Sequence, residues 1–308
     1  GRHNGYHGTT VAGASLGGMK GMHDQGGLPI PDIHHIDPPF WFADGGDLSE
    51  EEYGIAAARR LEQKILELGP ERVAAFIGEP VMGAIGVYIP PMSYWKEIER
   101  ICRQYDVLLV ADEVICGFGR TGQWFGSQHF GIQPDVMTIA KGITSGYIPL
   151  GAALFNDRVA GVLKDAGGEL AHGATYSGHP VCAAVALENL RIMREERIVE
   201  RAREEVAPYL AQRWAELGGH RLVGEARIVG MMGALELVPD KGRRAFFPER
   251  GKVGGLCRDI ALRHGLILRA TYDSMLLSPP LVLTREQVDE LFDKAWKALD
   301  ETARAIGH

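Results

Sequence analysis

The sequence has few cysteines, no long apolar run and no excess of basic charge. Its four cysteines form no C-x-x-C pair and show no spacing typical of a metal site; they are Cys102, Cys116, Cys182 and Cys257. Such thiols are typical of a reducing compartment, so we expect a cytoplasmic protein. No apolar run reaches the about 18 residues that a membrane helix needs, and we expect neither a membrane span nor a signal peptide. A net charge of −7 argues against a nucleic-acid partner.

Two short apolar runs form the centre of the chain of 308 residues. Residues 107–111 and 136–140 are typical of buried strands in a parallel sheet, which predicts an α/β fold. Each run is followed by a charged residue, Asp112 after the first and Lys141 after the second, and 29 positions separate these two. Because catalytic groups in open α/β sheets lie at the carboxyl ends of strands, Asp112 and Lys141 are candidates for one site.

The chemistry of this pair suggests a cofactor. A buried lysine has a lowered pKa and can bond to a carbonyl carbon, and a buried aspartate needs a cationic partner. Pyridoxal phosphate meets both requirements, because it offers an aldehyde to the lysine and a protonated ring nitrogen to the aspartate. If only Asp112 and Lys141 are considered, it is equally good to interpret them as two charged side chains in solvent-exposed loops.

Five short motifs occur in order along the chain. They are Tyr6-His7-Gly8, Asp112-Glu113-Val114, the glycine-rich residues 117–122, Ala140-Lys141-Gly142 and Thr175-Tyr176-Ser177-Gly178-His179-Pro180. Together they resemble the class III aminotransferases, which are fold type I enzymes that depend on pyridoxal phosphate. The likeness covers essentially the whole chain and is strongest to the ω-transaminases.

The resemblance implies which residues bind the cofactor ring. Lys141 is expected to hold pyridoxal phosphate and to act as the general base, and Asp112 to keep the ring nitrogen protonated. Tyr6 is expected to stack on the ring and to contact the substrate, and its neighbour His7 is expected to contact the cofactor. Val114 is expected to pack on the opposite face of the ring. Stacking of this kind contributes roughly 0.5–1.5 kcal/mol beyond burial.

Three further residues take their expected roles from the same resemblance. Glu79 follows another predicted strand and is expected to help orient the cofactor, although a salt bridge would also explain it. Thr175 is expected to cross a dimer interface and bind the phosphate of the neighbour's cofactor, which makes a homodimer a catalytic requirement. Arg269 is expected to bind the substrate carboxylate and to swing aside for amines that lack one.

These roles predict transfer of an amino group from an amine or ω-amino acid to a keto acid, with pyruvate as the expected acceptor and ping-pong kinetics. A class III aminomutase or decarboxylase would share Lys141 and Asp112.

In the family, a substantial segment with a phosphate-binding Gly-Ser pair precedes the position of Tyr6. We therefore expect a fragment, the ordered part of a longer chain or a naturally short homologue, and an inactive truncated homologue stays an alternative.

Two other motifs suggest different enzyme classes. Gly13-Ala14-Ser15-Leu16-Gly17 fits the G-x-S-x-G motif of serine hydrolases, but no convincing strand precedes it. The glycine-rich residues 117–122 fit G-x-G-x-x-G, but a dinucleotide site needs a helix directly after the glycines. We expect both matches to be accidental, and a serine hydrolase at Ser15 is the more remote alternative function.

The pattern along the chain predicts two domains. Residues 1–195 are predicted to form a large domain that binds pyridoxal phosphate, with a mixed, mostly parallel sheet flanked by helices. Residues 196–308 are predicted to form a small α+β domain, with a strand-like run at 227–238. Two capping boxes predict helices, one after Ser49 and one after Thr284.

Overall fold

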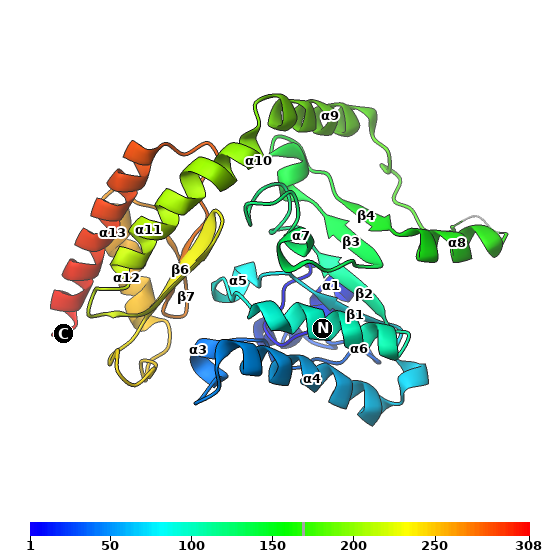
Figure 1. Ribbon diagram of the computed structural model, residues 1–308, viewed down its shortest axis with the longest axis horizontal. Helices are drawn as coiled ribbons and strands as arrows, with labels where there is room; N and C mark the ends of the chain where they lie inside the picture. The colour runs from blue at the N-terminus through cyan, green and yellow to red at the C-terminus, as the bar shows by residue number, and fades with distance from the viewer. Residues whose placement is uncertain (168–169) are drawn as a thin grey trace.

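The computed structural model describes residues 1–167 and 170–308, and it contains two separate four-stranded sheets (Figure 1). The first sheet has the strand order β1-β2-β3-β4, and the second has the order β5-β6-β8-β7. The two sheets confirm the predicted α/β fold with an additional α+β part. None of the helices in the described ranges is long and apolar enough to cross a membrane.

The first sheet is mostly parallel, as predicted. Strands β1, β2 and β3 run parallel, and β4 pairs with β3 in the antiparallel direction. The four strands are β1 (Ala75–Gly78), β2 (Leu108–Asp112), β3 (Val136–Ile139) and β4 (Ala152–Phe155). Parallel strands place their carboxyl ends at one edge of the sheet, and this edge carries the charged residues discussed below.

Helices α4 (Glu50–Leu68) and α6 (Met92–Gln104) pack against each other beside this sheet. The predicted capping box begins α4, since Ser49 accepts a hydrogen bond from the amide of Glu52 and the Glu52 carboxylate accepts one from the amide of Ser49. The apolar faces of both helices join one core cluster with β1 and β2. The shorter helices of this part are α1 (Val11–Leu16), α2 (Lys20–His23), α3 (Trp41–Asp44), α5 (Gly83–Gly86), α7 (Gly126–Phe130) and α8 (Asp157–Asp165).

The chain passes to the second sheet through a broken helix. Helix α9 (Pro180–Glu195) ends before Arg197, which has a left-handed backbone with φ of 51°. Helix α10 (Ile198–Arg201), a π-helical turn over Ala202–Val206 and α11 (Ala207–Leu217) follow without a further turn. The proposed boundary between residues 195 and 196 falls at this break and stays a prediction.

The second sheet is antiparallel throughout, and its strands are β5 (Val223–Val229), β6 (Met232–Leu237), β7 (Arg269–Thr271) and β8 (Ser274–Leu277). The prediction of one strand-like run over residues 227–238 is wrong. This run contains the end of β5, a two-residue turn at Gly230 and Met231, and the whole of β6. Gly230 has φ of 54°, and a Cβ there would lie 2.4 Å from the Thr121 carbonyl carbon, so this turn requires glycine.

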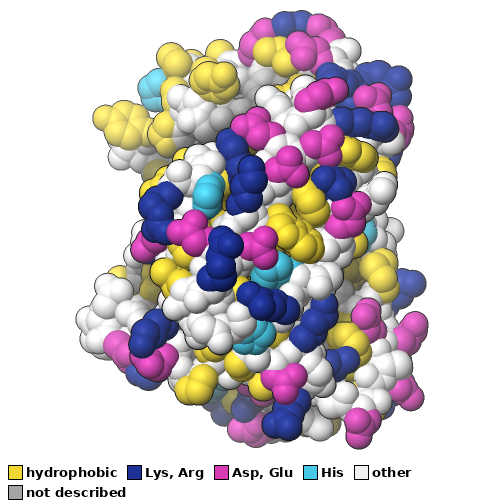
Figure 2. Space-filling view, turned by 90° about the vertical axis from the view of Figure 1, so that its left-hand side faces the viewer, with side chains coloured by type: hydrophobic (Ala, Val, Ile, Leu, Met, Phe, Trp, Pro, Cys, Tyr) yellow, Lys and Arg dark blue, Asp and Glu magenta, His cyan; other side chains and the backbone are white. Residues whose placement is uncertain are grey.

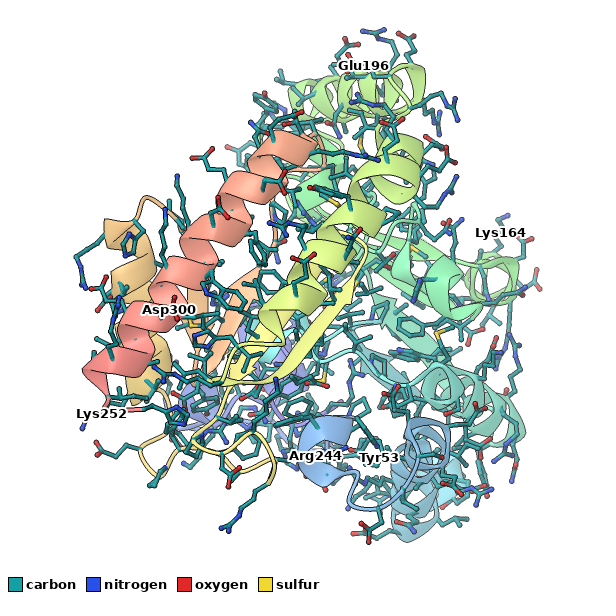
Figure 3. The ribbon with its side chains drawn as sticks, turned by 60° about the vertical axis from the view of Figure 1, so that its left-hand side comes forward. Tyr53, Lys164, Glu196, Arg244, Lys252 and Asp300 are labelled. Atoms are coloured by element: carbon teal, nitrogen blue, oxygen red, sulfur yellow. The ribbon has the colours of Figure 1, made fainter. Side chains whose placement is uncertain are left out.

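Helices α11, α12 (Lys252–Arg263) and α13 (Arg285–Ala305) cover one side of the second sheet, and α11 and α13 lie side by side (Figure 3). The predicted capping box at Thr284 and Gln287 begins α13. The apolar faces of these helices and the inner sides of β5 and β6 form one core cluster. The outer surface of this part carries Lys and Arg interspersed with Asp and Glu (Figure 2).

Candidate active site

Three charged residues lie at the carboxyl ends of the three parallel strands. Glu79 directly follows β1, Asp112 is the last residue of β2, and Lys141 comes two positions after β3. The strands are adjacent and in register, with Asp112 opposite Thr138 on β3. The sheet therefore brings together two acids and one amine from sequence positions far apart, as predicted for Asp112 and Lys141.

Lys141 has an unusual backbone and a perturbed side chain. Its φ of 45° is in the left-handed region, which is uncommon for a residue other than glycine. The residue as a whole is exposed to solvent. Its side-chain amine is partly buried, and this burial lowers the pKa of the amine. The charges of Asp112 and Glu79 oppose this effect by raising the pKa, and the Arg269 guanidinium lowers it further. The amine of Lys141 therefore lies within electrostatic reach of Asp112, Glu79 and Arg269.

Asp112 is buried and held by two hydrogen-bond partners. Nδ1 of His7 lies 2.6 Å from Oδ2 of Asp112, and both side chains are less than a tenth exposed. The backbone amide of Val114 donates to Oδ1 at 3.1 Å. The described contact of His7 is therefore with Asp112, and its predicted contact with the cofactor stays a prediction. Val114 is half-buried two positions further along.

Glu79 is a buried acid that binds backbone amides. Its Oε1 accepts a hydrogen bond from the amide of Tyr6 at 3.1 Å, and its Oε2 accepts one from the amide of Gly83 at 3.1 Å. Burial raises the pKa of Glu79, and the nearby Arg2 guanidinium opposes this by lowering it. Within the described residues no side-chain salt bridge to Glu79 forms, because Arg2 donates to its backbone carbonyl. Glu79 therefore fixes the segment that carries Tyr6.

Buried Arg2 and Glu113 were not predicted as parts of this region. Glu113 is fully buried beside Asp112 and accepts hydrogen bonds from the amides of Gly126 and Ser127 at 2.8 and 2.6 Å. It thereby binds the first turn of α7. The position of Glu113 next to Asp112 in the sequence is one indication that Glu113 belongs to this region. The residues next to Arg2 in the sequence do not indicate that it binds the Glu79 carbonyl.

Within the described parts of the chain, Thr175 forms no hydrogen bond with Lys141, Asp112 or Glu79. It lies in the exposed loop that connects α8 to α9. This loop follows β4 and α8 at the end of the first sheet (Figure 1), and most side chains of these two elements are also exposed. Its predicted role toward a neighbouring subunit stays a prediction. Arg269 begins β7 in the second sheet and is exposed, and its expected contact with a substrate carboxylate stays a prediction.

The serine hydrolase alternative is excluded by the position of Ser15. The residue lies inside α1 and is fully buried. Its Oγ donates to the Val11 carbonyl at 2.7 Å and accepts from the Ile30 amide at 3.1 Å. A nucleophile elbow needs an exposed serine between a strand and a helix, and Ser15 has neither property.

The glycine-rich residues 117–122 form a loop of turns and not the start of a helix. Arg120 in this loop donates to the carbonyls of Met231 and Pro279 in the second sheet's part of the chain. The accidental nature of the G-x-G-x-x-G match is therefore confirmed. The described residues also contain no group of three or more His, Cys, Asp or Glu that could hold a metal ion.

The donor set at the strand ends fits pyridoxal phosphate. The amine of Lys141 suits the aldehyde, and the buried carboxylate of Asp112 suits the ring nitrogen. Glu79 at the same edge binds the backbone amide of the aromatic residue Tyr6. An α/β sheet with this arrangement defines a pyridoxal phosphate-dependent enzyme of fold type I.

The chain belongs to the class-III aminotransferase family, since the family model described as Aminotransferase class-III matches residues 2–299. It is 60% identical over 306 residues to the putrescine--pyruvate aminotransferase of Pseudomonas aeruginosa, covering 99% of this chain and 67% of that protein. It is 45% identical to the diaminobutyrate--2-oxoglutarate transaminase of Halomonas elongata, with the same two coverages. The structure of the omega transaminase from Pseudomonas jessenii in complex with PMP matches with a TM-score of 0.95 and 46% identity, covering 99% of this chain and 68% of that one.

The chain thus spans about two thirds of the length of these relatives. Family and fold together make it an aminotransferase that uses pyridoxal phosphate. The expectation of an ω-transaminase-like enzyme is confirmed.

Proposed function

We propose that the enzyme transfers the amino group of a primary amine, a diamine or an ω-amino acid to pyruvate by a ping-pong reaction. The relative at 60% identity is named for putrescine and pyruvate, and a 42% identical transaminase structure with a TM-score of 0.94 contains L-alanine, the product expected from pyruvate. The observation that carries the proposal is the position of Lys141, Asp112 and Glu79 at the carboxyl ends of three adjacent parallel strands. The Arg269 guanidinium is near enough to lower the pKa of Lys141.

Lys141 moves the proton in this proposal. When bound, pyridoxal phosphate supplies an electron sink and carries the amino group between the two substrates. Nζ of Lys141 removes a proton from the amine-bearing carbon of the donor and returns one to the acceptor in the second half-reaction. Partial burial, which lowers the pKa of Lys141, favours the neutral amine that this step requires. His7 fixes the orientation of the Asp112 carboxylate, which keeps the ring nitrogen protonated.

The remaining residues bind and orient. Tyr6 and Val114 enclose the ring from two sides, and Glu79 holds the backbone of Tyr6 in place. Arg269 binds the carboxylate of pyruvate through its planar fork of donors and moves aside for a donor that has no carboxylate. We place the protein in the cytoplasm, since all four cysteines are free thiols.

We further propose a homodimer in which Thr175 of each subunit binds the phosphate of the other subunit's cofactor. Large apolar side chains are exposed on the loop of Thr175 and on the segments that precede and follow it in the chain, and such exposure favours a protein interface. They include Tyr147 at 87%, Tyr176 at 80%, Leu187 at 69% and Val162 at 68%.

An absorbance spectrum with added pyridoxal phosphate tests the activity. We expect a band that depends on Lys141, is absent in Lys141→Ala, and is lost when putrescine is added. Product analysis should then give alanine from pyruvate in a one-to-one ratio with the oxidised donor. Release of carbon dioxide, or a rearranged amine without pyruvate consumption, would instead identify a decarboxylase or an aminomutase.

Mixing two inactive variants tests the shared site. In a mixed dimer of Lys141→Ala and Thr175→Ala, one of the two sites contains both wild-type residues. Random exchange makes half of the dimers mixed, so we expect about a quarter of the wild-type activity. A mixture that stays as inactive as its components would show that Thr175 acts within its own subunit. A Thr175→Ala variant that is fully active by itself would show that Thr175 has no role in the site.

A further inference from the structure

Arg227 of β5 reaches from the second sheet to a segment beside the active site. Its guanidinium is buried and donates to two backbone carbonyls at the end of α5. Nε lies 2.9 Å from the Gly86 oxygen and 3.1 Å from the Val87 oxygen, and Nη2 lies 2.6 Å from the Gly86 oxygen. One side chain therefore satisfies the carbonyls that end this short helix.

Acidic partners keep the guanidinium in this orientation. Nη2 also donates to Oε2 of Glu236 at 2.9 Å, and Nη1 donates to Oε2 of Glu225 at 2.7 Å. Glu236 is fully buried, and the Ser274 hydroxyl donates to the same Oε2 at 2.6 Å. A buried arginine that is paired with acids adds little to the stability of the folded protein. Its more important effect is to specify one arrangement of the groups around it.

The α5 end that Arg227 binds is strained. Val87 is a β-branched residue with φ of 52°, a backbone conformation that such residues rarely adopt. Gly86 has φ of 152°, and a Cβ there would lie 3.2 Å from Nη2 of Arg227. Strain of this kind persists only where the surroundings fix the backbone, and it is concentrated at functional sites.

The other end of α5 leads to the active site. The amide of Gly83 donates to Glu79, whose second carboxylate oxygen accepts from the amide of Tyr6. The Thr271 hydroxyl donates to the Ala84 carbonyl at 3.2 Å, and Thr271 lies two positions after Arg269 on β7. Helix α5 is thus bound on one side to the segment of Tyr6 and on the other side to the strand of Arg269.

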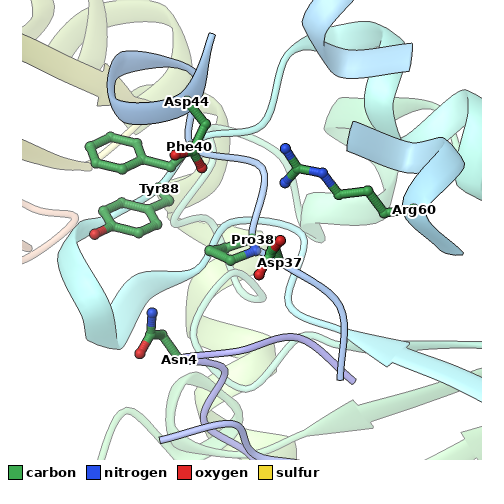
Figure 4. A pocket seen from close by; sticks show the side chains of 7 residues that line it. All are labelled: Asn4, Asp37, Pro38, Phe40, Asp44, Arg60 and Tyr88. Carbon is green, nitrogen blue, oxygen red and sulfur yellow. The ribbon is translucent and has the colours of Figure 1, made fainter. Parts of the chain in front are cut away.

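An aromatic stack surrounds the same contact. The guanidinium carbon of Arg227 lies 4.9 Å from the ring centre of Phe40 and 5.4 Å from that of Tyr88. These two rings are parallel, with centres 3.8 Å apart, and they line a cavity of about 480 Å³ (Figure 4). Neither Lys141 nor Asp112 lines this cavity. The aromatic stack is therefore part of the contact between Arg227 of the second sheet and the segments beside the first sheet, and it is separate from the strand ends that carry Lys141 and Asp112.

We propose that Arg227 is a positioning residue for the aminotransferase reaction. By fixing α5, it keeps Glu79 and the Tyr6 backbone in place on one side and the strand of Arg269 on the other. The inference rests on the site roles proposed above, in particular on Arg269 as the group that binds the carboxylate of the keto acid.

The test compares Arg227→Lys with Arg213→Lys. Lysine keeps the positive charge but lacks the planar fork that binds two carbonyls and stacks on the rings. Arg213 is a matched control, because it also stacks on an aromatic ring, Phe292 at 3.8 Å, and pairs with an acid, Asp289, but lies away from α5. Each variant is measured by amide hydrogen exchange without substrate and by steady-state kinetics with putrescine and pyruvate.

We expect Arg227→Lys to speed amide exchange over residues 79–88 at least about tenfold, because the hydrogen bonds that hold α5 are lost. We also expect the KM for pyruvate to rise about tenfold while the KM for the amine, which lacks a carboxylate, changes little. Equal changes in both variants, or faster exchange only within the second sheet, would overturn the proposal.

Thr271→Val serves as the second variant if Arg227→Lys does not fold. It removes only the hydrogen bond from β7 to α5, so we expect faster exchange at the amide of Ala84 and its neighbours. Unchanged exchange there would contradict the inference. A wild-type protein that does not accept pyruvate would refute the proposed function, but the exchange comparison would still decide the role of Arg227.

Discussion

Lys141 is predicted to destabilise the protein when the cofactor is absent, for two separate reasons. Its backbone is left-handed, which costs roughly 1–2 kcal/mol for a residue other than glycine. Its partly buried amine has a lowered pKa, so the folded cofactor-free protein disfavours the charged form that predominates at pH 7. Each effect can be isolated with a pair of variants.

The backbone effect is isolated by comparing Lys141→Gly with Lys141→Ala. Glycine relieves the left-handed strain but gains about 0.4–1 kcal/mol of chain entropy when unfolded, so the net gain is about 1 kcal/mol. For a domain of this size such a gain raises the melting temperature by about 2–4 °C. Thermal unfolding of both cofactor-free variants, followed by circular dichroism, measures the difference.

The charge effect is isolated by comparing Lys141→Met with the wild type at several pH values. Because the pKa of Lys141 is lowered on folding, the unfolded chain binds more protons between the folded pKa and the ordinary value of 10.5, and wild-type stability rises with pH in this window. Lys141→Met is therefore expected to melt higher at pH 7, and its advantage should shrink as the pH approaches 10.5. An advantage that is absent at pH 7, or that grows with pH, would refute this reasoning, as would a glycine variant no more stable than the alanine variant.

Three further predictions concern neighbouring residues. Asp112→Asn should lower kcat by about 10²-fold or more, because the electrostatic stabilisation of the ring nitrogen is lost, and stopped-flow absorbance with an amine measures this. Arg269→Gln should raise the KM for pyruvate roughly tenfold or more with little effect on the KM for an amine without a carboxylate, and equal effects on both substrates would contradict carboxylate binding. Glu113→Gln should lower the melting temperature, because an amide presents only one acceptor oxygen to the two amides of α7 and each charge-assisted hydrogen bond is worth about 1.5–3 kcal/mol; an unchanged melting temperature would count against this.

The sequence predicts elements well where the signal is local. The capping boxes at Ser49 and Thr284 satisfy helix amides with side chains three residues away, so the pattern alone is sufficient. The positions of Asp112 and Lys141 follow from two apolar runs and the rule that sites lie at strand carboxyl ends. These are the parts of the fold and the site that the residues themselves specify.

The sequence fails where the deciding contact is distant. The hairpin between β5 and β6 was missed because its two-residue turn carries a single glycine and none of the usual Asn-Gly or Asp-Gly pairs. Arg227 appears in the sequence as one charge within a strand, and only the folded chain brings it to Gly86 at the end of α5, 141 positions away. The proposed role of Thr175 involves a second subunit, and local sequence patterns within one chain do not encode contacts of that kind.

The hydrogen bond between His7 and Asp112 has a consequence for how the protein folds. The two residues are 105 positions apart, and the bond between Tyr6 and Glu79 spans 73 positions. Contacts between residues so far apart in the sequence form late in folding. The chain must first lose the entropy of closing a long loop, and only then does the contact contribute its stabilising energy. At the proposed site, tight cofactor binding is therefore expected only after these distant segments have docked. During synthesis, the cofactor is expected to trap the finished fold and not to nucleate it.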